Sequence, residues 1–302
     1  MRVFVTGATG FIGGTVAVRL VEAGHQVVGL ARTEDKAAAL RGFGLEPVLG
    51  HLDDAEVLAG AAREADAVVN AASSDHRGAV EVLVESLAGT GKPLLQTSGS
   101  SIVGDNAGGE ASDRVFTEAD VLPGGGWEPT PDKAHRVEID RFLLAAADRG
   151  VRTVVLCNTL IYGHGRGPAR DSVQVPRLVS QARRSGVVRH VGPGRNIWSN
   201  VHVDDVAELY LLALESAPGG SFHFVESGEE SFGAIAQAVA DRLGVGQPEA
   251  WDLESAIAEW GYERAVYALG SNSRVRSTRA RELGWQPRHR SVTGWIGEVS
   301  EL

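Results

Sequence analysis

Short apolar runs alternate with amphipathic segments through the first half of the chain, and they predict strands and helices in turn. Strands are expected at 3–5, 26–30, 46–52, 67–73, 93–97 and 151–157. Helices are expected at 14–22, 78–88 and 132–148, with glycines 24 and 150 as stops. A chain of 302 residues can bury one large α/β core, or one and a half domains.

The second half mixes helix-like and strand-like segments less regularly. Helices are expected at 172–185, 232–243 and 251–261, and strands at 187–191 and 221–225. Asp204 is expected to cap a further helix that runs through Leu214. Residues 105–131 are rich in glycine, proline and charge, so they predict an irregular loop.

A glycine-rich motif joins the first strand to the first helix, with the sequence Thr6-Gly7-Ala8-Thr9-Gly10-Phe11-Ile12-Gly13. The N-terminus of a helix presents free N–H groups and partial positive charge, so it suits a diphosphate. Gly7 permits the tight turn, Gly10 lets the backbone approach the phosphates, and Gly13 lets helix and strand pack closely. We therefore expect a dinucleotide here, with contacts from Gly7, Thr9, Gly10, Phe11, Ile12 and Gly13.

This motif resembles the fingerprint of the extended short-chain dehydrogenase/reductase superfamily, the group of NAD-dependent epimerases and dehydratases. The segments 198–207 and 283–287 resemble further parts of the same superfamily. The resemblance implies a doubly wound parallel-sheet (Rossmann) domain at residues 1–157. It also implies a smaller C-terminal substrate-binding lobe at 158–302, interleaved with the last strands of the Rossmann sheet.

The residues after the second predicted strand indicate which dinucleotide is preferred. An acidic residue there would bind the ribose 2′-hydroxyl of NAD, but the chain has Ala31-Arg32-Thr33. Arg32 can pair with a 2′-phosphate and Thr33 can donate to it, so NADP(H) is favoured over NAD(H). Glu34 and Asp35 count against this preference, and Arg32 can also merely stack on adenine or face solvent.

The exits of the later strands supply the other expected cofactor contacts. Small side chains at Ala71, Ala72 and Ser73 resemble the superfamily segment that lies along the cofactor backbone. Ligands bind outside the carboxyl ends of such strands. The remaining positions at which the resemblance implies cofactor contacts are Ser98, Arg136, Asn158 and Leu160.

The usual catalytic residues of the superfamily are missing. These are a Ser or Thr after the fifth strand and a Tyr-x-x-x-Lys on the next helix, where the lysine holds the nicotinamide ribose and lowers the tyrosine pKa. Matching Asp140 to the acidic position after that lysine aligns Asp132 with the tyrosine, Arg136 with the lysine and Gly99 with the serine. No tyrosine lies between residues 1 and 161, so the tyrosine is missing in any nearby register.

Substitute catalysts are therefore expected on that helix and beside it. Asp132, His135 and Arg136 share one helix face, where Arg136 can hold the ribose and His135 can donate a proton. Asp132 beside Arg136 should stay ionised, which makes it a poor acid. Ser100 and Tyr162 are further candidate donors, directly or through water. A solvated charged face is the alternative explanation for the helix trio.

The substrate lobe offers polar and aromatic candidates for ligand contact, namely Ser101, Tyr162, Arg170, Gln174, Trp198 and Asn200. Three functions remain open: a reductase with substitute chemistry, a sugar-nucleotide epimerase or dehydratase, and a non-catalytic NAD(P)-binding regulator. The missing tyrosine counts against the second. In its missing tyrosine and its GC-rich composition the chain is similar to a tyrosine-lacking branch of the superfamily that reduces aromatic polyketide ketones, as in the angucyclinone reductases of simocyclinone-type pathways. A ketone hydrogen-bonded to its own phenol can accept hydride with little help.

Composition limits the partners and the compartment. The net charge of −10 argues against nucleic acid and anionic membranes. A single cysteine, Cys157, excludes an intrachain disulfide and fits a reducing cytoplasm. No apolar run is long enough to span a bilayer, and no metal site is expected. A homodimer built through two helices fits the superfamily, and the excess of arginine over lysine is typical of a GC-rich bacterial genome.

Overall fold

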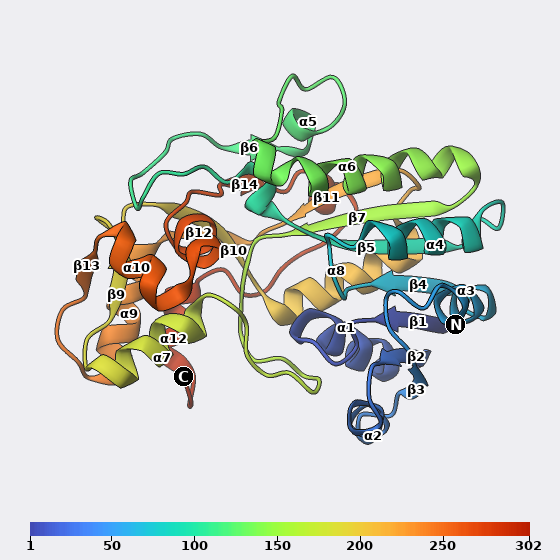
Figure 1. Cartoon of the computed structure of the whole chain (residues 1–302), viewed down its shortest axis with the longest axis horizontal. Coiled ribbons are helices and arrows are strands. Elements are labelled where there is room, and N and C mark those ends of the chain that lie inside the picture. Colours follow the sequence, from blue (N-terminus) through green and yellow to red (C-terminus); the bar gives the residue numbers. More distant parts are fainter.

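A seven-stranded parallel sheet forms the centre of the computed structural model, which spans residues 1–302 (Figure 1). The strand order is β11-β7-β5-β4-β1-β2-β3, and every neighbouring pair is parallel. This confirms the doubly wound α/β fold, since the order reverses direction beside β1. The strands of this sheet are β1 (Arg2–Thr6), β2 (Gln26–Ala31), β3 (Glu46–Leu49), β4 (Ala67–Asn70), β5 (Pro93–Gly99), β7 (Arg152–Asn158) and β11 (Ser221–Val225).

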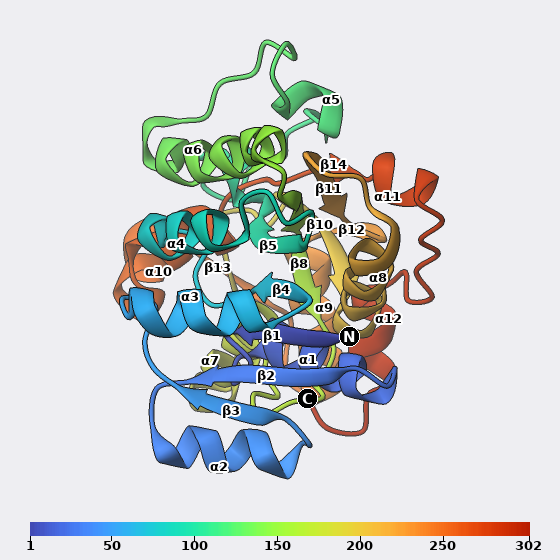
Figure 2. The same ribbon diagram turned by 90° about the vertical axis from the view of Figure 1, so that its right-hand side faces the viewer.

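Helices cover both faces of the sheet (Figures 1 and 2). One face carries α1 (Phe11–Glu22) and α8 (Val203–Ser216), with α2 (Glu34–Gly42) at the β3 edge. The other face carries α3 (Ala55–Glu64), α4 (Arg77–Leu87) and α6 (Pro131–Ala145). Both β11 and α8 lie beyond residue 158 in sequence, so the later chain returns to complete the sheet domain.

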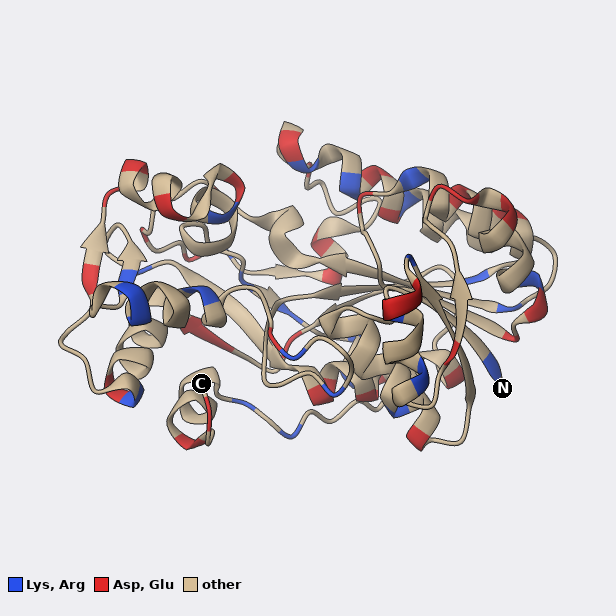
Figure 3. Cartoon of the chain, turned by 60° about the horizontal axis from the view of Figure 1, so that its bottom comes forward, with Lys and Arg blue, Asp and Glu red and all other residues tan.

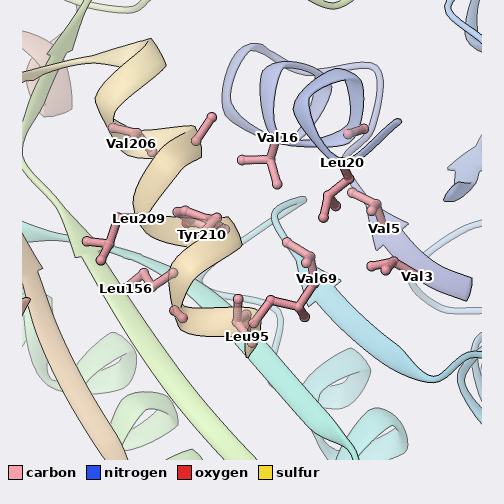
Figure 4. Packing of buried hydrophobic residues seen from close by; sticks show 14 of the residues in the cluster. Val3, Val5, Val16, Leu20, Val69, Leu95, Leu156, Val206, Leu209 and Tyr210 are labelled. Atoms are coloured by element: carbon pink, nitrogen blue, oxygen red, sulfur yellow. The ribbon is translucent and has the colours of Figure 1, made fainter. Parts of the chain in front are cut away.

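The core between α1, α8 and the sheet is built from aliphatic side chains (Figure 4). Val16 and Leu20 of α1 face Val206 and Tyr210 of α8, and all four are at most 1% exposed. The strands add Val3, Val5, Val69, Leu95 and Leu156 to the same cluster. Burial of each such side chain stabilises the fold by about 1.5–3 kcal/mol. This packing holds the carboxyl ends of the strands in place at one edge of the sheet.

The C-terminal lobe has its own hydrophobic cluster around Tyr162, Trp198 and Phe232. Its small sheet has the order β12-β10-β8, and a second pair joins β13 to β9. The strands of the lobe are β8 (Leu160–Tyr162), β9 (Arg189–Val191), β10 (Ile197–His202), β12 (Gly228–Ser231) and β13 (Glu249–Trp251). Its helices are α7 (Val175–Ser185), α9 (Phe232–Leu243), α10 (Leu253–Trp260), the π-helix η3 (Arg264–Leu269) and α12 (Val292–Glu298).

Short elements connect the lobe to the sheet domain. The predicted loop at 105–131 is largely irregular, but it contains a two-residue strand paired with the C-terminal segment. The short elements are η1 (Ser100–Val103), β6 (Phe116–Thr117), α5 (Glu118–Val121), η2 (Ala146–Arg149), β14 (Val275–Arg276) and α11 (Arg279–Glu282). Glu118 is fully buried and accepts hydrogen bonds from Phe224 and Thr278, so it ties this loop to the sheet and to the C-terminal segment.

Several predicted element bounds were wrong. The strands expected at 46–52 and 67–73 end at Leu49 and Asn70, α1 begins at Phe11 and not at residue 14, and α10 begins at Leu253 and not at residue 251. The helix expected from residue 172 begins at Val175, where Pro176 occupies the first turn. The cap of α8 is His202 rather than Asp204: the His202 ring accepts a hydrogen bond from the Asp204 N–H, and α8 runs from Val203 to Ser216. Asp204 instead sits in the first turn of α8 and binds Arg166. An aromatic cap of this kind has no strong sequence signature.

Candidate cofactor and active site

The glycine motif forms a tight junction between β1, α1 and the segment after β4. Gly7 has φ +70°, and a Cβ there would lie 2.6 Å from the carbonyl carbon of Ala71. A Cβ on Gly13 would lie 2.8 Å from the carbonyl carbon of Gly7. Gly10 caps α1 with extended backbone and no side-chain bond, so the first-turn N–H groups stay available for an anion.

A cavity of about 440 Å³ opens in front of this junction. Its wall contains seven of the fifteen predicted cofactor positions: Gly7, Thr9, Gly10, Arg32, Ala71, Ala72 and Ser73. Leu30, Lys36, His51, Leu52, Asp53 and His76 complete the lining. Phe11 and Ile12 lie in the first turn of α1 and pack against the core, and Gly13 is buried beneath them. Cβ atoms at Gly7 and Gly13 would collide with backbone, so these glycines let β1, α1 and the segment after β4 pack closely behind the cavity, as a dinucleotide-binding turn requires.

Positive charge gathers at the β2 end of the cavity. Arg32 and Lys36 both line it; Lys36 lies in the first turn of α2 and Arg32 just before that helix. Glu34, which counted against a 2′-phosphate, bonds Arg41 at 2.7 Å and does not line the cavity. Thr33 caps α2 by accepting from the Lys36 N–H, and it is absent from the cavity wall. Thr33 is therefore not placed to donate a hydrogen bond to a ligand in this cavity, whereas Lys36 is.

Outside the lining of this cavity, Arg136 joins three segments of the sheet domain. Its guanidinium binds both carboxylate oxygens of Asp75, with Nε to Oδ1 at 2.7 Å, and donates to Ser101 Oγ at 3.0 Å. Asp75 lies on the segment after β4 and Ser101 in η1 after β5, so α6 is fixed against both strand exits. The guanidinium holds the pKa of Asp75 below its usual range. Asp75 was not found from the sequence.

The predicted helix trio does not converge on one point. His135 is exposed, and its Nε2 lies 3.0 Å from the carbonyl oxygen of Asp75. Asp132 pairs with Lys133 at 3.0 Å rather than with Arg136. Burial raises the pKa of Asp132, but hydrogen bonds from Thr130 and Lys133 outweigh it, and the net pKa is lowered. Asp132 therefore stays ionised as expected, for a different reason.

Several predicted contact residues are buried inside the protein. Ser100 is 0% exposed, and its hydroxyl bonds Ser273 at 2.8 Å, so it faces the C-terminal segment. Ser98 donates to Asp140 at 2.6 Å, and burial raises the pKa of that carboxyl to about 7. Asn158 donates to the Tyr210 hydroxyl, and Leu160 is fully buried. None of these four side chains lines the cavity, because Ser98, Asn158 and Leu160 point into the core from their strands and Ser100 is buried in η1.

The predicted substrate residues divide in the same way. Tyr162, Trp198 and Asn200 are buried in the lobe, and Trp198 donates its indole N–H to the carbonyl of Ser271. Gln174 is also buried and donates to the carbonyl of Ala268 at 2.8 Å. Of this group, only Ser101 and Arg170 are not buried. Ser101 lies beside Arg136.

Arg170 borders a second cavity of about 500 Å³, between α7, α12 and the end of the chain. Arg183, Arg184 and Trp295 also line it. Arg170 binds Glu301 at 3.0 Å, and Arg183 donates to the carbonyl of Leu302. An arginine-rich wall beside an indole suits an acidic aromatic group.

The charges of the remaining surface show no single-sign face: in Figure 3, acidic and basic positions are mixed along both halves of the molecule. No cluster of three or more His, Cys, Asp or Glu side chains is placed to hold a metal ion. None of the helices combines the length and apolar character that crossing a membrane requires.

Comparison with known proteins agrees with this geometry. The sequence model of the NAD dependent epimerase/dehydratase family matches residues 3–224. Oxidase ucsJ of Acremonium sp. is 33% identical over 323 residues, which cover 95% of this chain and 92% of the relative. A Stigmatella aurantiaca protein, 4-hydroxy-2-methyl-3-oxo-4-farnesyl-3,4-dihydroquinoline-1-oxide ketoreductase, is 31% identical over 256 residues, covering 76% of this chain and 69% of the relative.

Among solved structures, dTDP-glucose 4,6-dehydratase of Bacillus anthracis in complex with NAD aligns with a TM-score of 0.76 at 17% identity. The alignment covers 98% of this chain and 94% of that one, and at this identity it shows the fold alone. The family match includes the glycine junction and every strand of the central sheet except the first residue of β1 and the last residue of β11. The chain therefore belongs to the NAD-dependent epimerase/dehydratase family.

Proposed function

We propose that the protein is an NAD(P)H-dependent reductase that transfers hydride to a carbonyl group without a tyrosine on α6. The observation that carries the proposal is the dinucleotide cradle, in which α1 presents unblocked N–H groups between glycines that admit no side chain. The similarity to a protein named as a ketoreductase supports reduction as the reaction. The reduced nicotinamide supplies the hydride, and the chain supplies binding and orientation.

NADPH is the preferred cofactor in this proposal. Arg32 and Lys36 form a pair of cations at the β2 end of the cradle, where the adenosine ribose of a dinucleotide lies in this fold. No acidic side chain follows β2 directly to bind a free 2′-hydroxyl. Asp53, which also lines the cavity, pairs with His76, with 3.1 Å between the Asp53 carboxylate oxygen and the His76 Nε2. Two cations therefore face the position of a 2′-phosphate.

At the nicotinamide end, Arg136 takes the place of the usual lysine. Its bidentate bond to Asp75 leaves further N–H donors, which can bind ribose hydroxyls. The same bond keeps the segment after β4 close to η1, so the cradle is preorganised at this end. Such positioning lowers the barrier by holding the reacting carbon near the cofactor.

The proposed substrate is an aromatic or polyketide-like ketone with a hydroxyl group near the carbonyl. A neighbouring hydroxyl can bond the carbonyl oxygen and stabilise the charge that hydride transfer creates. The name of the ketoreductase relative places a 4-hydroxy group next to a 3-oxo group. Epimerisation or dehydration of a sugar nucleotide requires removal of a hydroxyl proton by a strong base, and α6 lacks the tyrosine that does this.

The test is ketone-dependent oxidation of NADPH by the purified protein. The panel pairs each hydroxyketone with the same ketone in which the hydroxyl is replaced by hydrogen, and mass spectrometry identifies the alcohol. We expect turnover with the hydroxyketones, and slower or no turnover with their matched partners. Tight NADPH binding without turnover on any ketone would refute the reductase proposal and favour a regulatory protein.

A further inference from the structure

A lysine and an aspartate occupy the first turn of α6, where the family tyrosine is missing. Lys133 is only 8% exposed, and its ammonium lies 3.0 Å from the Asp132 carboxylate. Lysines are almost never this buried unless they are paired. Lysine is also rare in this chain, occurring otherwise only at positions 36 and 92.

The second partner of Lys133 comes from the distant π-helix η3. The Lys133 ammonium sits 3.8 Å from the centroid of the Tyr267 ring, within the range of a cation–π interaction. Tyr267 is partly exposed, and Tyr262 packs against it edge-on at 6.0 Å between ring centroids. A phenol therefore lies against the same first turn of α6 from which the family tyrosine is absent.

The position of Tyr267 is fixed by bonds to its own carbonyl and to the two residues that follow it. Gln174 donates to the carbonyl of Ala268 at 2.8 Å, and Asn196 donates to the carbonyl of Leu269 at 2.9 Å. Both amides are buried in the lobe. The Ser271 hydroxyl donates to the carbonyl of Tyr267 itself at 2.7 Å. Since π-helical turns are rare and recur at functional sites, this ordered turn is more than a connecting loop.

We propose that Tyr267 is the proton donor that replaces the tyrosine missing from α6, and that Asp132 and Lys133 position it. The inference rests on the proposed reductase function. It assigns the donor to the C-terminal lobe, so the active site is complete only when lobe and sheet domain pack together. His135 and Ser100, two of the donors expected from the sequence, bond to Asp75 and Ser273 instead.

The proposed step balances in atoms and charge. The carbonyl carbon gains a C–H bond from the hydride of the reduced nicotinamide, and the electron pair of the C=O π bond moves to oxygen. The Tyr267 O–H bond then breaks and its proton forms the new alcohol O–H. The phenolate left on Tyr267 is stabilised by the Lys133 ammonium over its ring and recovers a proton from water.

The charges around Tyr267 suit a donor that stays protonated at neutral pH. Partial desolvation, hydrogen bonding with Tyr262 and the nearby Asp132 carboxylate together raise the pKa of Tyr267 to about 12. Asp132 and Lys133 face it from α6, with Tyr262 at the entrance to η3. Asp132 opposes ionisation of the phenol, whereas Lys133 favours it once the proton has left.

The test combines turnover with a readout that does not depend on activity. Labelling with 3-fluorotyrosine gives fluorine signals from the four tyrosines of the chain, and Tyr267→Phe identifies the one from Tyr267. We expect NADPH to shift that signal. We expect Tyr267→Phe to lower kcat about 100- to 10,000-fold with NADPH affinity unchanged. Tyr162→Phe, which changes a tyrosine buried in the hydrophobic cluster of the lobe, is the matched control and should leave kcat unchanged.

Lys133 has its own control, because it acts through Tyr267. Lys133→Met should lower kcat without weakening NADPH binding, and Lys133→Arg should restore most of the rate, since a guanidinium also binds an aromatic face. Lys92→Met, which changes a lysine bonded to Arg63 and Ala65, should have no effect on kcat.

The outcomes separate this inference from the proposed function. If the wild type reduces ketones and Tyr267→Phe keeps its kcat, the assignment of Tyr267 is overturned while the reductase stands. If no ketone is reduced, the reductase proposal fails, and a Tyr267 signal that stays unchanged at saturating NADPH overturns the placement of Tyr267 as well. A folded Tyr267→Phe protein, checked by circular dichroism, is required, and Lys133→Met with its Arg rescue tests the same assignment should that variant unfold.

Discussion

Gly13→Ala separates cofactor binding from fold stability more sharply than any other substitution in the glycine motif. The added Cβ would lie 2.8 Å from the carbonyl carbon of Gly7 and 3.2 Å from the Ala71 Cβ. Both neighbours belong to the layer beneath α1, so α1 has to move outward by several tenths of an ångström. That movement carries the first-turn N–H groups away from the diphosphate position.

The two consequences differ in size. Alanine in place of glycine favours a helix by about 1 kcal/mol, and overpacking costs about 1–3 kcal/mol, so the free energy of unfolding falls by at most about 2 kcal/mol. A hydrogen bond to a charged group contributes about 1.5–3 kcal/mol, so losing one weakens NADPH binding about 10- to 100-fold. The variant should therefore stay folded and bind poorly.

Isothermal titration calorimetry measures NADPH affinity, and urea denaturation measures the free energy of unfolding. Gly60→Ala in α3 is the matched control, because nothing lies within 4 Å of its added Cβ. It should leave NADPH affinity unchanged and raise stability by up to about 1 kcal/mol. Gly13→Ala binding NADPH within twofold of the wild type would show that the diphosphate does not lie on α1.

Two further substitutions test the charges. Arg32→Asp should weaken NADPH binding about 10- to 100-fold relative to NADH binding, as measured by calorimetry. Arg41→Asp is the control, because its partner Glu34 lies outside the cavity, and it should leave the ratio of the two affinities unchanged. Equal effects of the two substitutions would contradict the placement of Arg32 in the cofactor site. Burial raises the folded-state pKa of Asp140 to about 7, above its unfolded value of about 3.9, so its contribution is fully present below pH ~4 and is lost as pH rises through about 7. Urea denaturation should show stability falling with pH across this window by up to about 1.4 kcal/mol per unit, and Asp140→Asn should flatten the fall; an unchanged slope would contradict the raised pKa.

The fold and the diphosphate half of the site are predictable from the sequence because their signals are local. The glycines at 7, 10 and 13 lie within seven residues of one another, and the apolar runs locate the strands of the sheet. Arg32 follows β2 directly, so its place in the cavity was also expected. Lys36 lies in the first turn of α2, three residues after its cap Thr33, so a second cation near Arg32 could have been expected there.

The catalytic half depends on contacts that no local pattern shows. Asp75 meets Arg136 across 61 residues of sequence, and Tyr267 meets Lys133 across an even longer separation. Ser98 and Ser100 were expected to face the ligand. The pleat of β5 instead directs Ser98 toward α6, and Ser100 in η1 bonds Ser273. Side-chain direction at a strand exit follows from packing, so it cannot be read from residue type.

Deuterium transfer tests the central claim most directly. The protein is mixed with NADPH deuterated at the 4-pro-S position and with each hydroxyketone, and the alcohol is analysed by mass spectrometry. Gly13→Ala serves as the control for transfer that does not pass through the cradle. If the site transfers hydride, the wild type should give deuterated alcohol and the variant far less. Unlabelled alcohol, or no alcohol from a protein shown to bind NADPH tightly, would contradict hydride transfer as the function of this site.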